Sequence, residues 1–274
     1  MYTVKILNGN IATTIHDDQA DETLVAGEIV EEINCFSTFV FSIYPVNPGF
    51  DLLDPFKTTV TVFNDKRSRY DFKGRIFSIT PSMDASGIVC KIVACQGQMS
   101  YLMDSVQSWQ PEKQWSGGGN LTGLQEYIDF LLTNHNAQVE DYKKIYRGEV
   151  TLQTYLTSGG VYKGTNYQDT WTVLKDKLLN VFDGEMRVRE TGGVLYLDYA
   201  EQLGVTRTTE IKLGHNMESI KREVDPSGIV TRLIPLGAKV KVLTTSIDEN
   251  GNETTTETET EERLTIKSVN DDVV

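Results

Sequence analysis

Apolar and polar residues alternate with a period of two through most of the first hundred residues of this chain. Such alternation is typical of β-strands that bury one face. Turn-forming residues separate the alternating stretches, and Asn8-Gly9 is a strong signal for a two-residue hairpin. Strands at this even spacing indicate a small β-barrel or sandwich. The predicted strands cover residues 2–7, 10–15, 28–33, 36–44, 58–63, 70–81 and 87–95.

The stretch 36–44 stands out because it is rich in aromatic residues. Side chains alternate between the two faces of a strand, so Phe39 and Phe41 would share one face, and Phe36 and Tyr44 the other. Aromatic residues on both faces predict a core strand that is buried on both sides. An aromatic binding face is the alternative.

The period changes towards 3.6 residues after the predicted strands, which indicates helices. A short helix is predicted over residues 96–107. A longer one is predicted over residues 123–134, where five apolar residues fall on one stripe. Thr122 is the expected N-cap, with Gln125 three residues later as in a capping box.

A further helix is predicted over residues 171–182, opened by Asp169 or Thr170. Residues 185–197 follow as a hairpin that turns at Thr191-Gly192-Gly193. Residues of about 104 to 203 are therefore predicted to form an α+β unit, inserted into or following the all-β part.

Strand character returns in the last quarter of the chain. Residues 253–262 are almost wholly Thr and Glu. Thr favours strands and Glu protects an exposed edge, so a solvated strand is favoured over a disordered tail. The predicted strands cover residues 208–213, 217–222, 229–236, 239–246 and, after a turn at 248–251, the Thr/Glu stretch.

Charge narrows the choice of partners. The chain has 39 acidic and 26 basic residues, a formal net charge of -13. This balance argues against a protein that grips nucleic-acid phosphates or docks on an anionic membrane. The first residues do not form a signal peptide, and no apolar stretch is long enough to cross a bilayer, so synthesis in a cytoplasm is expected.

The sequence contains none of the common catalytic or metal-binding motifs. His16, His135 and His215 lie far apart, and HExxH, CxxC and GxSxG are all missing. The run Gly117-Gly118-Gly119 lacks the Lys of a phosphate-binding loop. No catalytic, metal or cofactor site is therefore expected, although a Ser–His–Asp triad assembles in space and spacing alone does not exclude one. His16 and Asp17 are expected to form a surface pair.

The three cysteines, Cys35, Cys90 and Cys95, are expected to be buried free thiols. Two tryptophans, Trp109 and Trp115, are the candidate contact residues for a partner subunit or a glycan. Both fall in a stretch, 109–119, that is predicted to be a loop. Packing of these rings against the following helix is the competing interpretation.

Several segments occur in an order that is similar to a known family. They are residues 39–44 with 58–63, residues 72–76, residues 95–98 with 101–105, and residues 228–237, which contain Thr231-Arg232-Leu233 and Gly237. Together they resemble the N-terminal hub region of phage tail-associated lysins, the prophage endopeptidase tail family of siphophages. The resemblance covers essentially the whole chain.

This resemblance implies a fold similar to the myophage baseplate hub, a β-rich α+β fold of small β-barrel tube-type domains with an α+β insertion. The first barrel would combine residues 1–103 and 204–237, the insertion would be 104–203, and residues 238–274 would supply strands of a second tube-like domain. The family pattern continues beyond residues 263–270, whereas the given sequence stops at Val274, so the second barrel is expected to be incomplete.

The resemblance also implies a virion structural protein at the tail tip, made in the bacterial host cytoplasm. Its expected partners are other copies in a homotrimer, the distal tail protein or tail tube, and tail fibre or receptor-binding proteins. No enzyme activity is expected, because wall hydrolysis in this family generally belongs to C-terminal domains. A peptidoglycan hydrolase or endopeptidase and a carbohydrate-binding adhesin are the alternatives. An acidic tube lumen would repel passing DNA, which is one use for the net charge.

Overall fold

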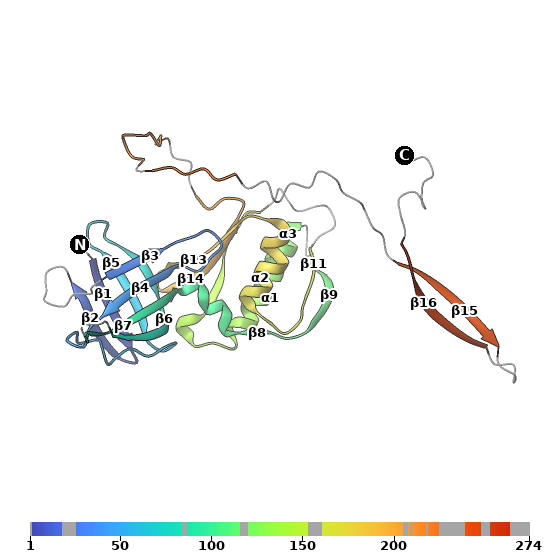
Figure 1. The fold of residues 1–274 in the computed structure, drawn as a ribbon, viewed down its shortest axis with the longest axis horizontal. Helices are drawn as coiled ribbons and strands as arrows, with labels where there is room; N and C mark the ends of the chain where they lie inside the picture. The colour runs from blue at the N-terminus through green and yellow to red at the C-terminus, as the bar shows by residue number, and fades with distance from the viewer. Residues whose placement is uncertain are drawn as a thin grey trace. The chain divides into compact units, whose positions relative to one another are not determined.

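The structure is a computed structural model of the chain. It describes residues 2–17, 26–83, 87–115, 120–152, 161–204, 208, 210–217, 219–224, 239–247 and 253–263. The chain forms two compact units, Met1–Thr206 and Arg207–Val274, and each is described by itself (Figure 1). The predicted fold class, β-rich α+β, is confirmed.

An antiparallel seven-stranded sheet forms the first part of the first unit, with the order β2-β1-β5-β6-β7-β4-β3. The hairpin predicted at Asn8-Gly9 joins β1 to β2, and Gly9 has a φ of 59°, which favours glycine. The strands are β1 (Tyr2–Asn8), β2 (Ile11–Asp17), β3 (Ala26–Val30), β4 (Thr38–Ile43), β5 (Thr59–Asn64), β6 (Arg69–Met83) and β7 (Val89–Gly97).

One face of this sheet is buried, as the alternation predicts. Strand β5, for example, buries Val60 and Val62, whereas Thr61 between them is half-buried. The segment after β4 covers part of the core: the Asn47 side-chain amide donates to the Ile15 carbonyl at 2.7 Å. A Cβ at Gly49 would lie 2.2 Å from the Ile15 side chain, so only glycine fits there.

The prediction that the aromatic stretch is buried on both faces is wrong. Phe39 and Phe41 are buried in the sheet core, but Val40 between them is 40% exposed. Phe36 precedes β4 and packs against Trp171, with ring centroids 5.1 Å apart, in a different core. The sheet therefore has a core face and a solvent face, as antiparallel sheets commonly do.

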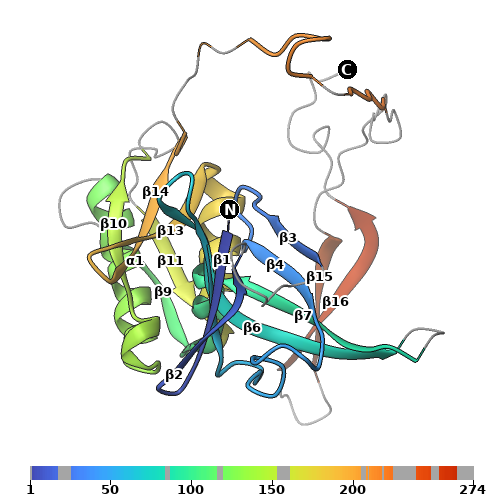
Figure 2. The ribbon, with the colours of Figure 1, turned by 90° about the vertical axis from the view of Figure 1, so that its left-hand side faces the viewer.

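The hairpin of β6 and β7 is longer than the rest of the sheet and extends beyond it (Figure 2). Burial along β6 ends at Ile76, and the following residues to Met83 are exposed or half-buried. The register between the two strands shifts between Ile76 and Ser78, the mark of a β-bulge.

The second part of this unit is an α+β layer with its own apolar core. Strands β10 and β14 are parallel, β13 pairs antiparallel with β14, and helix α1 packs on β10. The elements are η1 (Gln98–Asp104), β8 (Val106–Gln107), β9 (Gln110–Trp115), α1 (Asn120–Asn136), η2 (Asp141–Lys143), β10 (Ile145–Val150), β11 (Val161–Thr165), β12 (Gln168–Asp169), α2 (Thr170–Leu174), η3 (Lys175–Leu179), α3 (Asn180–Phe182), β13 (Glu185–Thr191) and β14 (Val194–Ala200).

Both long predicted helices are present, with differences at their ends. Helix α1 begins at Asn120 rather than after Thr122. The second helix is continuous over α2, η3 and α3, and η3 is a π-helical turn. Asp169 caps it as predicted, because its carboxylate accepts from the Thr172 backbone N–H at 2.9 Å.

The loop prediction for residues 109–119 is wrong in its first half. Residues Gln110–Trp115 form strand β9, which pairs antiparallel with β11. The composition gave no strand signal there, because four residues of β9 are exposed and polar or Pro. Pairing with β11 decides the conformation.

The second unit contains strands β15 (Lys239–Ile247) and β16 (Glu253–Arg263), paired as a two-stranded ribbon. The strand predicted for the Thr/Glu stretch is thereby confirmed. The strands predicted at 208–213 and 217–222 are wrong: the described residues there form an isolated bridge, Leu213 to Met217, around a turn. The predicted strand 229–236 lies outside the described residues, so the assignment of 204–237 to the first domain stays a prediction.

Candidate functional site

The two candidate tryptophans differ sharply in exposure. Trp115 is 8% exposed and packs on Tyr127 and Phe130 with centroid distances of 5.3 and 5.1 Å. Its indole N–H donates to the Lys163 carbonyl at 2.9 Å. Trp109 is 59% exposed. Because the Trp115 ring is buried and packed in this way, it cannot stack on a ligand. Trp109 is therefore the remaining candidate for a glycan or partner contact.

Trp109 lines a shallow hollow of about 330 Å³ on the α+β layer. The opposite wall comes from helix α1 and the turn after it, with Phe130, Asn134 and Gln138. The Gln138 side chain already bonds to the backbone of Val106 in both directions, at 3.0 Å each. The hollow thus offers one exposed aromatic face and few free polar groups.

A serine–histidine pair that the sequence did not reveal lies inside the α+β layer. Ser105 Oγ is 2.7 Å from His135 Nδ1 and 2.7 Å from Thr170 Oγ1. The second ring nitrogen of His135 is 3.2 Å from the Lys143 carbonyl. Ser105, His135 and Thr170 are at most 1% exposed. No substrate reaches a nucleophile buried in this way, and the network has the form of a structural one.

Burial also determines the protonation of His135. Removal of the ring from water lowers the pKa of His135, because the charged form loses its solvation; the hydrogen bond to Lys143 and the charge of Asp104 oppose this less strongly. A lowered pKa keeps the imidazole neutral near pH 7, as its acceptor and donor roles in the network require.

The other chemically reactive residues are scattered. Cys95 is buried in the sheet and burial raises the pKa of its thiol, whereas Cys90 is half-buried and Cys35 is exposed. The expectation of three buried thiols is therefore wrong for Cys35. His16 and Asp17 are both half-buried at the end of β2. In the part of the chain that the structure describes, no cluster of His, Cys, Asp and Glu suits a metal ion.

A cluster of charges joins the sheet to the α+β layer. Arg75 of β6 bonds to both carboxylate oxygens of Asp104, one of them at 2.8 Å, and Lys143 Nζ lies 3.0 Å from the same carboxylate. The side chains of Arg75 and Lys143 are 3% and 9% exposed. Burial alone would raise the pKa of Asp104, but the bonds from Arg75 and Lys143 outweigh it and lower that pKa. The carboxylate stays charged and holds the two parts together.

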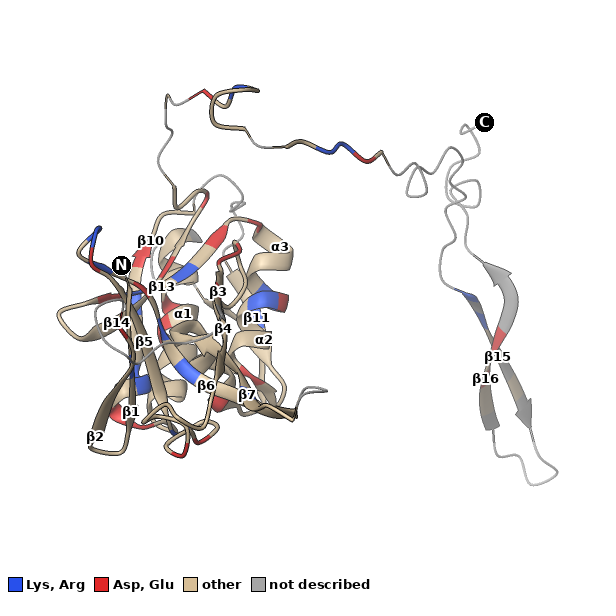
Figure 3. Ribbon diagram, turned by 60° about the vertical axis from the view of Figure 1, so that its left-hand side comes forward, with Lys and Arg blue, Asp and Glu red and all other residues tan. Residues whose placement is uncertain are grey.

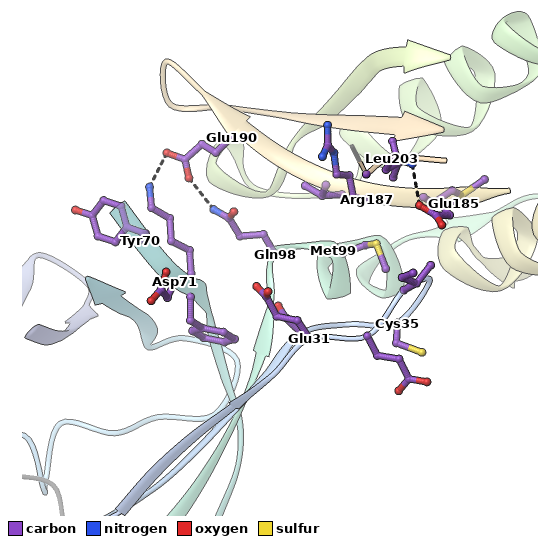
Figure 4. Close-up of a pocket in the computed structure, with 18 residues that line it drawn as sticks. Glu31, Cys35, Tyr70, Asp71, Gln98, Met99, Glu185, Arg187, Glu190 and Leu203 are labelled. Atoms are coloured by element: carbon purple, nitrogen blue, oxygen red, sulfur yellow. Dashed lines mark hydrogen bonds and ion pairs between the residues drawn. The ribbon is translucent and has the colours of Figure 1, made fainter. Parts of the chain in front are cut away.

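Beside this joint lies a cleft of about 750 Å³, the larger of the two hollows described here. One wall is the loop after β3 and the start of β6, and the other is β13 (Figure 4). Carboxylates and apolar side chains predominate in its lining. The acidic members are Glu31, Glu32, Asp71, Glu185 and Glu190, the basic ones Lys73 and Arg187, and the apolar ones include Ile33, Phe72, Met99 and Met186.

Two contacts cross the cleft and fix its width. Glu190 of β13 accepts from Lys73 Nζ and from Gln98 Nε2, both at 2.9 Å (Figure 4). At the other end, Asn34 donates to the Gly184 carbonyl at 2.9 Å and accepts from the Met186 N–H at 2.7 Å. Asn34 has a φ of 59°, a conformation that Asn tolerates better than most residues.

The outer part of the β6–β7 hairpin exposes several large apolar side chains. Phe77, Met83, Ile88, Val89 and Ile92 are between 40% and 68% exposed. Apolar side chains gathered on one projecting element commonly mark a contact with another molecule. Along the ribbon of the first unit, positions of Lys, Arg, Asp and Glu occur on many elements and do not gather on one of them (Figure 3).

No protein-family model matches the chain, and no curated protein matches it in sequence. Among solved structures, it is similar to prophage tail protein gp18 from Listeria monocytogenes, with 14% identity, a TM-score of 0.48, and coverage of 94% of this chain and 68% of that one. It is also similar to a tail protein from Neisseria meningitidis, with 14% identity, a TM-score of 0.42, and coverage of 72% and 50%.

A third similar structure is the 43 kDa tail protein of prophage MuSo2 from Shewanella oneidensis, with 13% identity, a TM-score of 0.42, and coverage of 78% and 57%. The chain thus spans between half and about two thirds of the length of these proteins. None of the described helices is long and apolar enough to cross a membrane.

Proposed function

We propose that this chain is a structural subunit of a phage or prophage tail, a hub at the tail tip that joins the tail tube to distal host-recognition or wall-penetrating parts. The observation that carries the proposal is the β6–β7 hairpin, which projects beyond the sheet core and exposes apolar side chains over its outer part. Subunits of an assembly need such surfaces, and an isolated protein gains nothing from exposing them.

The ordered sequence segments that resemble the tail-associated lysin hub region support the same proposal. On this proposal the chain is the platform of a tail lysin and not its hydrolase. The buried Ser105–His135 pair agrees with this role, because its atoms are closed to a peptide or glycan substrate.

The proposal includes assembly as a homotrimer, with the tail tube or distal tail protein on one side and fibre or receptor-binding proteins on the other. The protein would be made in the host cytoplasm and would act in the virion. Neither cofactor nor nucleic acid has a part in this function.

Immunogold electron microscopy tests the location. Antibodies raised against the purified chain are applied to particles induced from a lysogen that encodes it. Label at the tail tip, lost after preadsorption with the chain, is the expected result. Label on the head or along the tail shaft, or particles without label, would contradict a tail-tip hub.

A complementation experiment tests the part played by the hairpin. Particles are induced from a lysogen whose own copy is deleted and which carries Val89→Lys/Ile92→Lys in trans. The variant is expected to fold but to enter particles at a much reduced level. Val46→Lys is the control for an added exposed lysine, because Val46 is 93% exposed and lies in the segment after β4, outside the hairpin strands. Equal incorporation of both variants would show that the hairpin is not needed for assembly.

A carbohydrate-binding adhesin is the second candidate, and the exposure of Trp109 beside its hollow is the observation that favours it. An exposed aromatic ring suits stacking on a sugar, and its loss is tested below.

A further inference from the structure

Strand β13 is the edge of the three-stranded sheet, and its outer edge borders the cleft. Asn34 already pairs with one end of that edge: its side chain accepts from the Met186 N–H and donates to the Gly184 carbonyl. These are the two bonds that a residue of a neighbouring strand would make. One side chain of the protein therefore already pairs with this edge as a neighbouring strand would.

Further backbone N–H groups of β13 point outward along the rest of this edge. In an antiparallel ladder, the N–H and C=O of alternate residues point away from the partner strand. The ladder of β13 with β14 has no register shift, so the N–H groups of Val188 and Glu190 point the same way as that of Met186. Among the hydrogen bonds between described residues, neither of these two N–H groups has an acceptor.

A second open edge faces the same cleft from β6. Residues Arg69 to Arg75 pair with β5 on one side, whereas on the other side β7 begins to pair only at Gly74, opposite Gly97. Beyond Gly97 the chain turns into η1. Tyr70, Phe72 and Lys73 of β6 are thus paired on one side only, and Asp71 lies at a register shift between them. All four residues line the cleft.

The lining favours a particular chemistry in whatever lies between the two edges. It holds five carboxylates against two cations, a formal charge of -3. Both cations are engaged: Lys73 with Glu190 at 2.9 Å and Arg187 with Asp198 at 3.2 Å. A hydrogen bond from Asn64 lowers the pKa of Asp71, so this carboxylate keeps its charge. Ile33, which is 64% exposed, and Tyr70, which is 51% exposed, provide apolar contacts beside the carboxylates.

We propose that the cleft is a β-augmentation site that binds an extended segment of a partner protein in which basic and apolar side chains alternate. The segment pairs with the outer edge of β13 at Val188 and Glu190. Its basic side chains face Glu31, Glu32 and Asp71, and its apolar side chains face Ile33 and Tyr70. Binding through an open strand edge gives affinity from the main chain and specificity from alternate side chains.

The dimensions suit this occupant. The stretch from Met186 to Glu190 offers about 13 Å of edge at roughly 3.3 Å per residue. The volume of about 750 Å³ falls within the range of roughly 300–1,000 Å³ that is usual for binding sites. The cleft belongs to this chain whatever assembly contains it, so the proposal stands or falls separately from the tail-tip function.

The test uses the full chain and a fluorescein-labelled peptide of alternating Lys and Val, followed by fluorescence anisotropy. Saturable binding is expected. A peptide with alternate residues N-methylated keeps the charges but loses two to three main-chain hydrogen bonds, so it is expected to bind about 10–100-fold more weakly. A Glu–Val peptide is expected not to bind. Absence of Lys–Val binding, or equal binding after N-methylation, would overturn the proposal.

Variants locate the site on the protein. Glu31→Lys is expected to weaken binding several-fold, whereas Glu28→Lys makes the same charge change outside the cleft lining and is expected to have little effect. Equal loss in both would indicate adsorption to an acidic surface and would refute the site.

Hydrogen exchange on the unaltered chain provides a readout that does not depend on any variant folding. The amides of Val188 and Glu190 are expected to exchange rapidly in the free protein and more slowly with the Lys–Val peptide bound. Exchange rates at these two amides that do not change on saturation would show that β13 is not the docking edge.

Discussion

The seven-stranded sheet and the α+β layer both bury an apolar core, but they satisfy their backbone polar groups in different ways. In the sheet, neighbouring strands supply the hydrogen bonds to the backbone groups. Alternation keeps polar side chains such as Thr61 off the core face. In the α+β layer, short and irregular elements leave backbone groups that side chains must reach. Gln107 donates to the Leu131 carbonyl at 2.9 Å, and Tyr127 to the Gly164 carbonyl at 3.1 Å.

This difference shows why one region follows from its pattern and the other does not. A ladder needs only the correct period. A core that contains buried amides, hydroxyls and an imidazole needs particular partners, and each partner lies far away in the sequence. Polar substitutions in the α+β layer should therefore cost stability through lost bonds to backbone groups. In the sheet, such bonds come from the segments beside the strands, as from Asn47 to the Ile15 carbonyl.

The largest effect is expected from the apolar core of the sheet. Phe41→Ala removes a ring that is 1% exposed, and the lost burial and the cavity should lower the free energy of unfolding by about 3–5 kcal/mol. Urea denaturation followed by far-UV circular dichroism measures this. Val40→Ala on the solvent face is the control and should cost well under half as much. Similar costs for both would mean that β4 is buried on both faces after all.

The joint between the two regions should come next. Asp104→Ala leaves the buried Arg75 guanidinium unpaired, and it should cost about 2–3 kcal/mol, because the carboxylate keeps some solvent contact. Asp129→Ala, which removes the carboxylate of the more exposed pair with Arg147, is the comparison and should cost under about 1 kcal/mol.

Acid should abolish the difference between wild type and Asp104→Asn. The folded-state pKa of Asp104 lies below the ordinary aspartate value of 3.8, so the stabilisation is complete above that value. It is lost as the pH falls through the lowered folded-state pKa. Denaturation between about pH 7 and pH 2 measures it. If the difference in stability between the two proteins were already lost on acidification above about pH 5, the titrating group would be another one than Asp104.

A smaller effect is expected from the polar network of the α+β layer. Ser105→Ala removes a hydroxyl that bonds both His135 and Thr170, and it should cost about 1–3 kcal/mol because buried groups lose their partners. Ser82→Ala, at a half-buried position in the β6–β7 hairpin, should change stability by less than about 0.5 kcal/mol. A Ser105→Ala protein as stable as wild type would show that the network does not contribute.

The smallest effect on stability is expected at Trp109. Trp109→Ala should change the free energy of unfolding by less than about 1 kcal/mol, because the ring is largely exposed. Binding to purified cell-wall glycans, measured by cosedimentation, separates the functional alternatives. Binding by wild type that Trp109→Ala abolishes would favour the adhesin, and no binding by either would leave the hub proposal alone. Trp115→Ala is unsuitable here, because it would disturb the core.

The strands of the sheet could be predicted because each buries one face and so leaves its period in the sequence. Strand β9 could not be predicted, because its four consecutive exposed residues leave no alternation in the sequence; they are Pro111, Glu112, Lys113 and Gln114. The helix over α2 to α3 showed its apolar stripe and its Asp169 cap, but nothing in the residues announced the π-helical turn.

The candidate sites were harder to predict than the fold. Trp109 and Trp115 looked alike as neighbours in a supposed loop, and only the pairing of β9 with β11 separates a buried ring from an exposed one. The cleft depends on where β7 stops pairing with β6 and on the edge position of β13, and neither leaves a residue pattern. A lone histidine among the apolar residues of α1 was the one available signal for the Ser105 network.

All three tryptophans of the chain, Trp109, Trp115 and Trp171, lie in the α+β layer. The intrinsic fluorescence of this protein therefore observes one half of its first unit and is blind to the other. When the seven-stranded sheet opens, tryptophan emission will change only to the extent that contacts between the two parts transmit the opening. The joint at Asp104 and the packing of Phe36 on Trp171 are two such contacts. The distribution of three indole rings thus makes the mechanical coupling between two cores directly measurable.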